Sequence, residues 1–180
     1  MSHVSEMGES IKEKLNKCGS EVKIYPMAKV IKPEVIEIGD YSRIGDFTFV
    51  YGGNGIRIGK YVNIAGFVSI IGGGELVIGD YAAVSWGSRI ITGTDTYYGG
   101  KRMSAALPKE QRNLIIGKVV IEKDAFIGAN AILHPNVRIG EGAIIGSNSL
   151  VLKDIEPWSV NVGSPCTKIG ERPRVVMPDI

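Results

Sequence analysis

Aliphatic residues return at every sixth position through most of this chain. They form three groups of three and, after a break, a final group of seven, and glycine directly follows many of them. The positions are Ile38, Ile44, Val50, Ile58, Ile64, Ile70, Ile78, Val84, Ile90, Ile115, Ile121, Ile127, Leu133, Ile139, Ile145 and Val151. This sustained short period predicts an all-β solenoid of stacked turns, because globular sheets and helical bundles do not repeat at this interval.

The six-residue interval is broken at three places, and three registers separate successive breaks. The step lengthens to eight residues after Val50 and after Ile70, and to 25 residues after Ile90. If three registers complete one triangular turn, all three insertions leave from the same corner. The first two insertions are rich in glycine, and the third is a long loop over residues 92–113.

If three registers continue to make one turn after the long loop, the same corner contains residues 128–130 and 146–148. We therefore expect one edge of the prism to be lined with glycine, asparagine and serine. Glycine leaves backbone groups uncovered, so an extended ligand can approach such an edge closely. Turn chemistry alone is the alternative explanation of these residues.

The two ends of the chain depart from the repeat. Residues 1–20 are expected to form a cap, with an α-helix over 5–18, because Met7, Ile11 and Leu15 fall at helical spacing. Such a cap would cover strand edges at the open end of the solenoid. The solenoid is expected over residues 21–155. Residues 156–180 hold four of the eight prolines, and we expect an irregular tail that folds back or reaches a neighbouring chain.

Composition places the chain among ordinary soluble proteins. Of its 180 residues, 44% are hydrophobic and 22% are charged, and the net charge of +2 argues against a protein that coats nucleic acid or membranes. Cys18 and Cys166 form neither a disulfide framework nor a metal-type spacing, so no metal is expected. An apolar signal core and a stretch of membrane-spanning length are both missing. These features predict a single cytoplasmic domain.

The repeating pattern of aliphatic residue, glycine and small residue, interrupted by a long insertion, resembles the hexapeptide-repeat acyltransferases. Their fold is a left-handed parallel β-helix. The resemblance covers about residues 20–172 and is strongest over 127–154 and over 162–172, where the ending has the small-Pro-x-x-Lys form. Within the family, the chain is most similar to sugar acetyltransferases of the galactoside-acetyltransferase type and of surface-polysaccharide gene clusters.

The resemblance implies a homotrimer whose active sites lie between neighbouring subunits, with acetyl-CoA bound along the groove as acyl donor. Small residues would border the pantetheine arm, and basic residues would approach the CoA phosphates, where their charge is favourable. Solvated surface charge is the alternative for the basic residues. Carried over by position, the donor-binding residues are Gly128, Ala129, Gly146, Ser147, Lys153, Pro165, Lys168 and Arg172.

Acyl transfer to a hydroxyl needs a general base and a donor for the developing oxyanion. The histidine that galactoside-type relatives carry before the long loop is absent here, where Thr94 or Asp95 fills its place, and some other relatives have histidine at the position of Asp124. His3 lies before the repeat. His134 is therefore the candidate base, because it follows an inward aliphatic residue on the coil above the loop. A simple turn residue is the alternative.

Asp95 is the second catalytic candidate. It could orient a histidine from a neighbouring subunit, hold the sugar, or act as a weak base. An amine that has lost its ammonium proton is already a good nucleophile, so it demands less of a base. The weak case for a histidine base therefore favours N-acetylation of an amino sugar.

The acceptor is expected near the long loop. Trp86 could stack on a sugar or a nucleotide base, or it could pack between subunits. Thr94, Tyr97 and Tyr98 are the other expected acceptor contacts, and a merely solvated, disordered loop is the alternative. The basic residues of the loop, which could meet a diphosphate, are Lys101, Arg102 and Arg112.

Together these features favour an acetyl-CoA-dependent sugar O-acetyltransferase of surface polysaccharide or glycoside metabolism. N-acetylation of an amino sugar, free or nucleotide-linked, is the first alternative, and a non-catalytic binding solenoid is the second. A carbonic-anhydrase-like member of the fold would need three histidines on a metal, and the chain has two.

Overall fold

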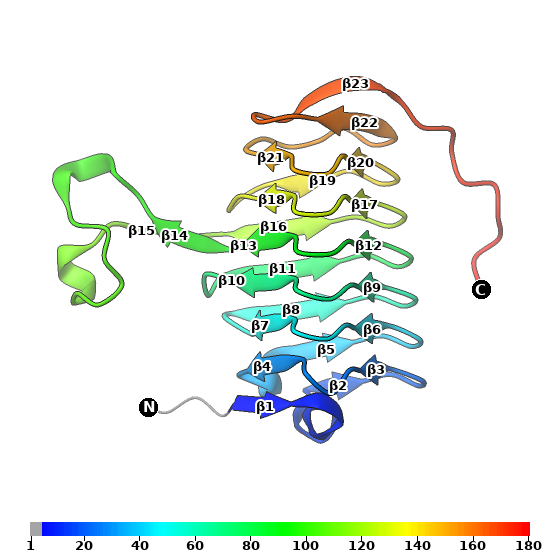
Figure 1. The fold of residues 1–180 in the computed structure, drawn as a ribbon, viewed down its shortest axis with the longest axis horizontal. Helices are drawn as coiled ribbons and strands as arrows, with labels where there is room; N and C mark the ends of the chain where they lie inside the picture. The colour runs from blue at the N-terminus through cyan, green and yellow to red at the C-terminus, as the bar shows by residue number, and fades with distance from the viewer. Residues whose placement is uncertain (1–4) are drawn as a thin grey trace.

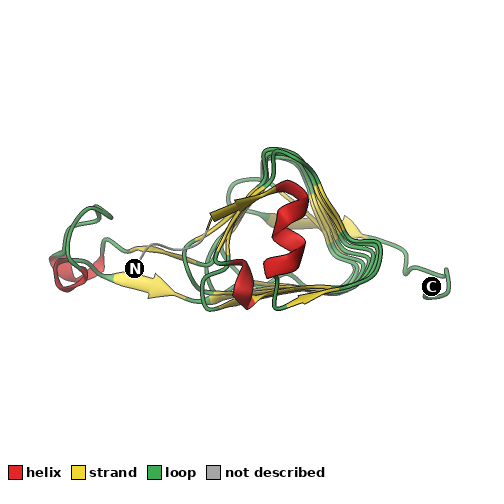
Figure 2. Ribbon diagram, turned by 90° about the horizontal axis from the view of Figure 1, so that it is seen from below, coloured by secondary structure: helices red, strands yellow, loops and turns green. Residues whose placement is uncertain are grey.

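The computed structural model describes residues 5–180, with side chains described from residue 7 onward. The chain winds as a solenoid of stacked turns, and three parallel sheets form the walls of a triangular prism (Figure 1, Figure 2). Each turn adds a strand to sheet B, then to sheet C, then to sheet A. We name the corners after the sheets they join, as the A–B, B–C and C–A corners. The solenoid predicted from the six-residue period is confirmed.

Three sheets carry nearly all the strands in the described part of the chain. Sheet A contains β4 (Lys29–Ile31), β7 (Phe49–Tyr51), β10 (Ser69–Ile71), β13 (Arg89–Ile91), β18 (Ile132–Leu133) and β21 (Leu150–Val151), with β1 (Ser5–Met7) antiparallel at its edge. Sheet B contains β2 (Lys17–Cys18), β5 (Ile36–Ile38), β8 (Gly55–Ile58), β11 (Glu75–Ile78), β16 (Lys118–Ile121) and β19 (Arg138–Ile139). Sheet C contains β3 (Lys23–Ile24), β6 (Arg43–Ile44), β9 (Asn63–Ile64), β12 (Ala83–Val84), β17 (Phe126–Ile127), β20 (Ile144–Ile145), β22 (Ser159–Val162) and, antiparallel at its edge, β23 (Thr167–Glu171).

Equivalent aliphatic residues of successive turns stack inside the prism. In sheet A, Ile70 pairs in register with Val50 on one side and Ile90 on the other, and Ile90 pairs with Leu133. All four are at most 1% exposed. Burying one such side chain is worth roughly 1.5–3 kcal/mol. The six-residue period is therefore the repeat of one hydrophobic column in each wall.

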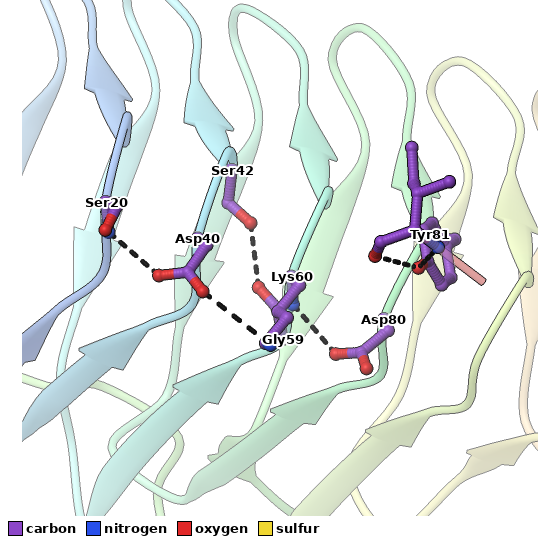
Figure 3. A network of polar contacts seen from close by, with 8 residues as sticks. Ser20, Asp40, Ser42, Gly59, Lys60, Asp80 and Tyr81 are labelled. Atoms are coloured by element: carbon purple, nitrogen blue, oxygen red, sulfur yellow. Dashed lines mark hydrogen bonds and ion pairs between the residues drawn. The ribbon is translucent and has the colours of Figure 1, made fainter.

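The B–C corner is held by aspartates that bridge neighbouring turns (Figure 3). Oδ1 of Asp40 accepts a hydrogen bond from the backbone N–H of Ser20 at 2.8 Å. Oδ1 of Asp80 accepts one from the backbone N–H of Lys60, also at 2.8 Å. Each carboxylate thus satisfies a backbone donor that the tight corner leaves outside the sheet ladder.

A ladder of tyrosines lines the same corner. Tyr41, Tyr61 and Tyr81 have positive φ angles of 60°, 54° and 60°, a conformation that costs energy for residues with a side chain. Their rings stack at centroid distances of 4.9 Å and 5.4 Å. Stacking of this kind contributes roughly 0.5–1.5 kcal/mol per pair, which offsets part of the backbone cost.

The N-terminal segment is shorter and tighter than the α-helix expected over 5–18. It is a 3-10 helix, η1 (Gly8–Lys14), which lies across the lower end of the prism (Figure 2). Residues 5–7 instead form β1, because pairing with the exposed edge of β4 satisfies their backbone groups. A second short 3-10 helix, η2 (Pro33–Val35), lies at the A–B corner. Within residues 5–180 no helix is long and apolar enough to cross a membrane.

The C-terminal segment is more regular than expected. β22 adds a strand to sheet C, and β23 pairs with it antiparallel at the top edge. Beyond β23 the chain leaves the sheet and runs back down beside the prism (Figure 1). There Nζ of Lys123 contacts Asp179 at 2.6 Å, and the hydroxyl of Tyr81 bonds to the backbone of Ile180 at 2.8 Å. The tail therefore does fold back on the coil.

The long loop projects away from the prism on a two-stranded stem (Figure 1). The stem pairs β14 (Gly93–Asp95) antiparallel with β15 (Leu114–Ile116). The loop beyond it contains two short 3-10 helices, η3 (Tyr98–Gly100) and η4 (Lys109–Gln111). Residues on this loop are thus carried well outside the body of their own chain.

The three insertions leave from one corner, as expected, but the upper part of that corner was wrongly assigned. Insertions after β7, β10 and β13 all lie at the A–B corner. Residues 128–130 and 146–148 follow β17 and β20, so they lie at the C–A corner instead. The count slipped by one register because Ile115 fits the period yet belongs to the stem strand β15. The prediction of a single glycine-lined edge is therefore wrong.

Candidate functional site

The root of the long loop is held rigidly at the A–B corner. The hydroxyl of Thr92 donates to the carbonyl of Ile71 at 2.9 Å and accepts from the backbone N–H of Gly74 at 2.9 Å. Thr92 is buried. A Cβ on Gly74 would overlap the carbonyl oxygens of Thr92 and Gly117, so the inserted glycine is needed for the turn below to pack against the stem. The loop therefore leaves the prism in a defined direction.

Asp95 lies on the loop stem and forms a two-point ion pair with Arg112. Nε of Arg112 donates to Oδ1 at 2.8 Å, and Nη2 donates to Oδ2 at 2.8 Å. The two side chains are 12% and 14% exposed. The hydrogen bonds from Arg112 lower the pKa of Asp95, against a smaller opposing effect of burial. Asp95 is thus a sheltered carboxylate that stays ionised at neutral pH.

The other predicted acceptor residues of the loop lie close to this pair. The hydroxyl of Thr94, one residue before Asp95, donates to the carbonyl of Asp95 at 3.3 Å. Tyr97 and Tyr98 follow, with hydroxyls 2.9 Å apart and side chains 71% and 65% exposed. Asn113 donates to the carbonyl of Tyr98 at 2.7 Å and so holds the turn. The loop thereby presents two exposed aromatic rings two and three residues beyond an ionised carboxylate.

His134 lies at the A–B corner, one turn above the root of the loop. It follows β18, whose Leu133 pairs with Ile90 of β13, so His134 stands above Ile91. Its backbone N–H donates to Val151 at 3.1 Å. Within the described residues its imidazole makes no hydrogen bond or ion pair, with Asp95 or with any other group. His3, the other histidine of the sequence, lies outside the described residues.

The C–A corner lies on the opposite edge of sheet A. In five successive turns its first position holds a small residue, and Ser85 is the one of the five with a hydroxyl, the members being Gly45, Ala65, Ser85, Gly128 and Gly146. Ser85 is half-buried, and its hydroxyl makes no hydrogen bond within the described chain. The sequence had not singled it out, although the contrast with glycine and alanine in the same column was a usable signal.

Trp86 and the small residues predicted to border the donor also lie at the C–A corner. Trp86 is 59% exposed and tilted against Phe67 at a centroid distance of 6.0 Å, so its ring is open to a ligand. Ala129 is half-buried and Ser147 is exposed. A Cβ on Gly128 would overlap the turn above at Ile145, so stacking of the turns already requires this glycine.

Three of the predicted donor-binding residues meet at the C-terminal end of the prism. A hollow of about 270 Å³ is lined by Val151, Leu152, Lys153, Ile155, Pro165, Cys166 and Thr167. A second hollow of about 230 Å³ shares Lys153 and extends to Lys168. Nζ of Lys168 donates hydrogen bonds to the carboxylates of Glu156 and Glu171, and these bonds raise the pKa of Lys168, so its ammonium group remains charged.

Arg172 is not part of this group. Its guanidinium donates to the carbonyl of Asp124 at 2.8 Å and to that of Gly142 at 3.2 Å. It also lies over the ring of Trp158, 5.9 Å from the centroid. The structure therefore places Arg172 at the B–C corner, where it ties the C-terminal segment to the prism. Elsewhere in the described chain, three or more histidine, cysteine or acidic side chains never gather into a group that could hold a metal.

Comparisons with known proteins agree with the fold. The family profile for the bacterial transferase hexapeptide (six repeats) matches residues 118–153. The chain superimposes with a TM-score of 0.87 on AntD, an N-acyltransferase from Bacillus cereus solved with dTDP and 3-hydroxybutyryl-CoA. The two are 34% identical, and the match covers 92% of this chain and 88% of AntD. The chain therefore belongs to the hexapeptide-repeat acyltransferases and shares their β-helix fold.

Two characterised relatives match shorter stretches. The dTDP-4-amino-4,6-dideoxy-D-glucose acyltransferase of Escherichia coli is 41% identical over 88 residues, which cover 48% of this chain and 46% of that protein. The galactoside O-acetyltransferase of Lactococcus lactis is 49% identical over 49 residues, or 27% of this chain and 24% of that protein. The chain thus matches less than half the length of these relatives.

Proposed function

We propose that the protein is an acyl-CoA-dependent N-acyltransferase that acylates the amino group of a nucleotide-linked amino sugar. The observation that carries this proposal is the sheltered, ionised Asp95 on the loop stem. It is supported by the similarity to AntD, which covers 92% of this chain. Solved AntD structures include variants of one serine and one aspartate that lie ten positions apart. In this chain Ser85 and Asp95 have the same separation, which supports placing both at the reacting centre.

The chemistry of Asp95 suits an amine better than a hydroxyl. A carboxylate whose pKa is lowered by Arg112 is a good hydrogen-bond acceptor and a weak base. It can hold an ammonium or amine group and orient its lone pair, but it cannot readily remove a proton from an alcohol. Asp95 is therefore proposed to contact the acceptor nitrogen, with Thr94, Tyr97 and Tyr98 around the sugar.

The hydroxyl of Ser85 has the chemistry needed on the other side of the reacting group. Hydroxyls can donate to an oxygen on which negative charge develops. Ser85 has no competing partner in the described chain, so this donor is free for the substrate. It is proposed to stabilise the acyl carbonyl during transfer.

The acyl donor is proposed to be acetyl-CoA or another acyl-CoA. The hollow beside Lys153 and Pro165 has mostly apolar walls with cations at its rim, which fits a long, weakly polar arm that ends in phosphates. Gly128, Ala129, Gly146 and Ser147 flank the other edge of the same sheet A, so both groups can border one groove along that wall. Arg172 is engaged elsewhere and is omitted from the donor site.

The site is proposed to be completed by a second copy of the chain, in a homotrimer. In one chain Ser85 precedes β13 and Asp95 follows it, so the width of sheet A separates them, and the stem carries Asp95 away from the prism (Figure 1). A neighbouring copy that receives this loop would bring its own C–A corner to Asp95. Mixing Ser85→Ala and Asp95→Asn proteins under reversible dissociation tests this arrangement. A shared site predicts that the mixture recovers activity that neither variant has, and a site within one chain predicts no recovery.

O-acetylation of a sugar hydroxyl is the second candidate function. It is supported by the similarity to galactoside O-acetyltransferase and by His134, whose imidazole is free of partners in the described chain and stands above the loop root. His134 would then be the general base. The two candidates are separated by following free-thiol release with acyl-CoA and matched acceptors. Turnover with amino sugars and not with their hydroxyl counterparts supports N-acylation, and the reverse pattern supports O-acetylation.

A further inference from the structure

A pocket of about 200 Å³ lies beneath Trp86 on the outer face of sheet C, below the column position of Ser85. It is lined by Tyr25, Arg43, Gly45, Asp46, Asn63, Ile64, Ala65, Gly66 and Trp86. No sequence motif pointed to it, because its lining comes from four successive turns. Its residues are brought together only by the stacking of equivalent corner positions.

The pocket is open because its back wall is made of small residues. Gly45 and Ala65 lie below Ser85 in the C–A corner column. The Trp86 ring packs on Gly66, where an added Cβ would come within 2.8 Å of the ring. Glycine at position 66 thus lets the ring lie over the pocket as a roof, with much of its surface still exposed.

Most polar side chains of the pocket have no hydrogen-bond or ion-pair partner within the described chain. Arg43 and Asn63 are exposed, and within the described chain neither side chain forms a hydrogen bond or an ion pair. The hydroxyl of Tyr25 also has no partner there. Asp46 differs, since its Oδ1 accepts from the backbone N–H of Met27 at 2.9 Å and so serves the fold. A guanidinium, an amide and a phenol therefore face an aromatic roof without internal partners.

These groups match the parts of a nucleoside diphosphate. An exposed indole offers a stacking surface to a base. A free guanidinium is suited to paired phosphate oxygens. A side-chain amide both donates and accepts, as the edge of a pyrimidine requires.

We propose that the pocket beneath Trp86 binds the nucleoside diphosphate part of the acceptor, with the base on Trp86 and the diphosphate at Arg43. The inference rests on the proposed function, which it deepens. The adenosine diphosphate end of CoA is a second source of the same chemistry. It is disfavoured because Lys153 and Lys168 lie toward the opposite, C-terminal end of the prism, several turns from Arg43.

The experiment uses Trp86 as its own reporter. Trp86 and Trp158 are the two tryptophans, so a Trp158→Phe protein leaves Trp86 as the single fluorophore. Thymidine diphosphate is titrated into this protein, and CoA is titrated in a separate arm. Saturable quenching by thymidine diphosphate, and none by CoA, is expected. Quenching by CoA alone would assign the pocket to the donor and overturn the proposal.

Substitutions locate the binding site. Arg43→Gln in the single-tryptophan background is expected to weaken thymidine diphosphate about tenfold or more, because a charge-assisted hydrogen bond is lost. Arg57→Gln is the matched control, since Arg57 is also an exposed arginine, on sheet B, and its loss should leave affinity unchanged. Equal weakening by both variants, or by neither, contradicts the proposal.

The outcomes for the pocket and for the proposed function are separable. If the protein acylates a nucleotide-linked amino sugar but Trp86 fluorescence is not quenched and Arg43→Gln has no effect, the pocket proposal is wrong and the proposed function is unaffected. If thymidine diphosphate binds at Trp86 but no amine is acylated, the proposed function is wrong and the pocket proposal is supported. An Arg43→Gln enzyme with a raised KM for the nucleotide-linked acceptor and an unchanged kcat would support both.

Discussion

Arg112 donates from Nε and Nη2 to the two carboxylate oxygens of Asp95 across the stem of the long loop, at 2.8 Å for each hydrogen bond. The partners are 17 residues apart and meet only because β14 and β15 pair as a stem. This contact does two things at once. It closes the stem on which the loop is carried, and it keeps the carboxylate of Asp95 ionised.

Replacing Asp95 by asparagine should reduce turnover strongly. Asp95→Asn keeps the size of the side chain but removes the charge that is proposed to hold the acceptor amine, so kcat should fall roughly 10²-fold or more. Steady-state rates with a nucleotide-linked amino sugar measure this loss, and circular dichroism checks that the β-helix persists. Wild-type turnover in a folded Asp95→Asn protein would remove Asp95 from the site.

The loop stem should loosen in acid and not in base. Because the pKa of Asp95 is lowered in the folded chain, the pair contributes stability above the unfolded carboxyl pKa of about 3.9. That contribution is lost as pH falls through the lower folded value. Hydrogen-exchange protection at the amides of Gly93–Asp95 should therefore be constant from neutral pH down to about pH 5 and should fall in more acidic solution. Protection already lost in that range, and equally in Asp95→Asn, would show that the pair does not hold the stem.

Substitution of His134 should matter little for amine acceptors. An amine needs less help from a base than a hydroxyl, so His134→Gln should lower turnover of an amino sugar by less than about tenfold. The measurement is kcat over a range of pH for the wild-type and variant enzymes. A loss of roughly 10²-fold or more, with a flattened pH profile, would identify His134 as the base and favour the second candidate function.

Glycine at the loop root should be required for stability. Gly74→Ala places a methyl group against the carbonyl oxygens of Thr92 and Gly117, and overpacking of this kind costs about 1–3 kcal/mol. Gly170→Ala is the matched control, because a Cβ there meets no atom within 4 Å. Urea unfolding should separate the two variants clearly. Equal stabilities would mean that the corner relaxes at no cost.

The basic residues that resemble donor-binding positions should divide into two groups. Lys153→Gln should raise the KM for acyl-CoA about tenfold, since Lys153 lines both C-terminal hollows. Arg172→Gln should leave that KM unchanged and lower the unfolding midpoint instead, because Arg172 is bonded to the backbone of Asp124 and Gly142. The opposite assignment of the two effects would place the donor at the B–C corner.

The wall structure of this protein could be predicted because its six-residue period is nearly unbroken. Each register needs only an aliphatic side chain inside and a turn after it, so local sequence carries almost all the information. The prediction failed where an aliphatic residue had the right spacing but did not lie in a wall of the solenoid. Ile115 has the right spacing but lies in β15, and this single false register moved Gly128 and Gly146 to the wrong corner.

The candidate site was less predictable because its contacts are not local. Asp95 was identified from its place before the loop, but its pairing with Arg112 depends on how the stem closes. Ser85 and the pocket beneath Trp86 were missed although the corner count is correct below the long loop, because the aliphatic period marks the inward positions and not the outward side chains that stack across turns. At the N-terminus, helical spacing was present, yet the open edge of β4 captured residues 5–7 as a strand.

The most direct measurement compares acyl transfer to two acceptors that differ in one functional group. Purified protein receives acyl-CoA with a thymidine-diphosphate-linked amino sugar or with the same compound bearing a hydroxyl in place of the amine, and thiol release is followed. The account predicts rapid release with the amine and release at the background rate with the hydroxyl. Equal release with both compounds, or release with the hydroxyl alone, would contradict it.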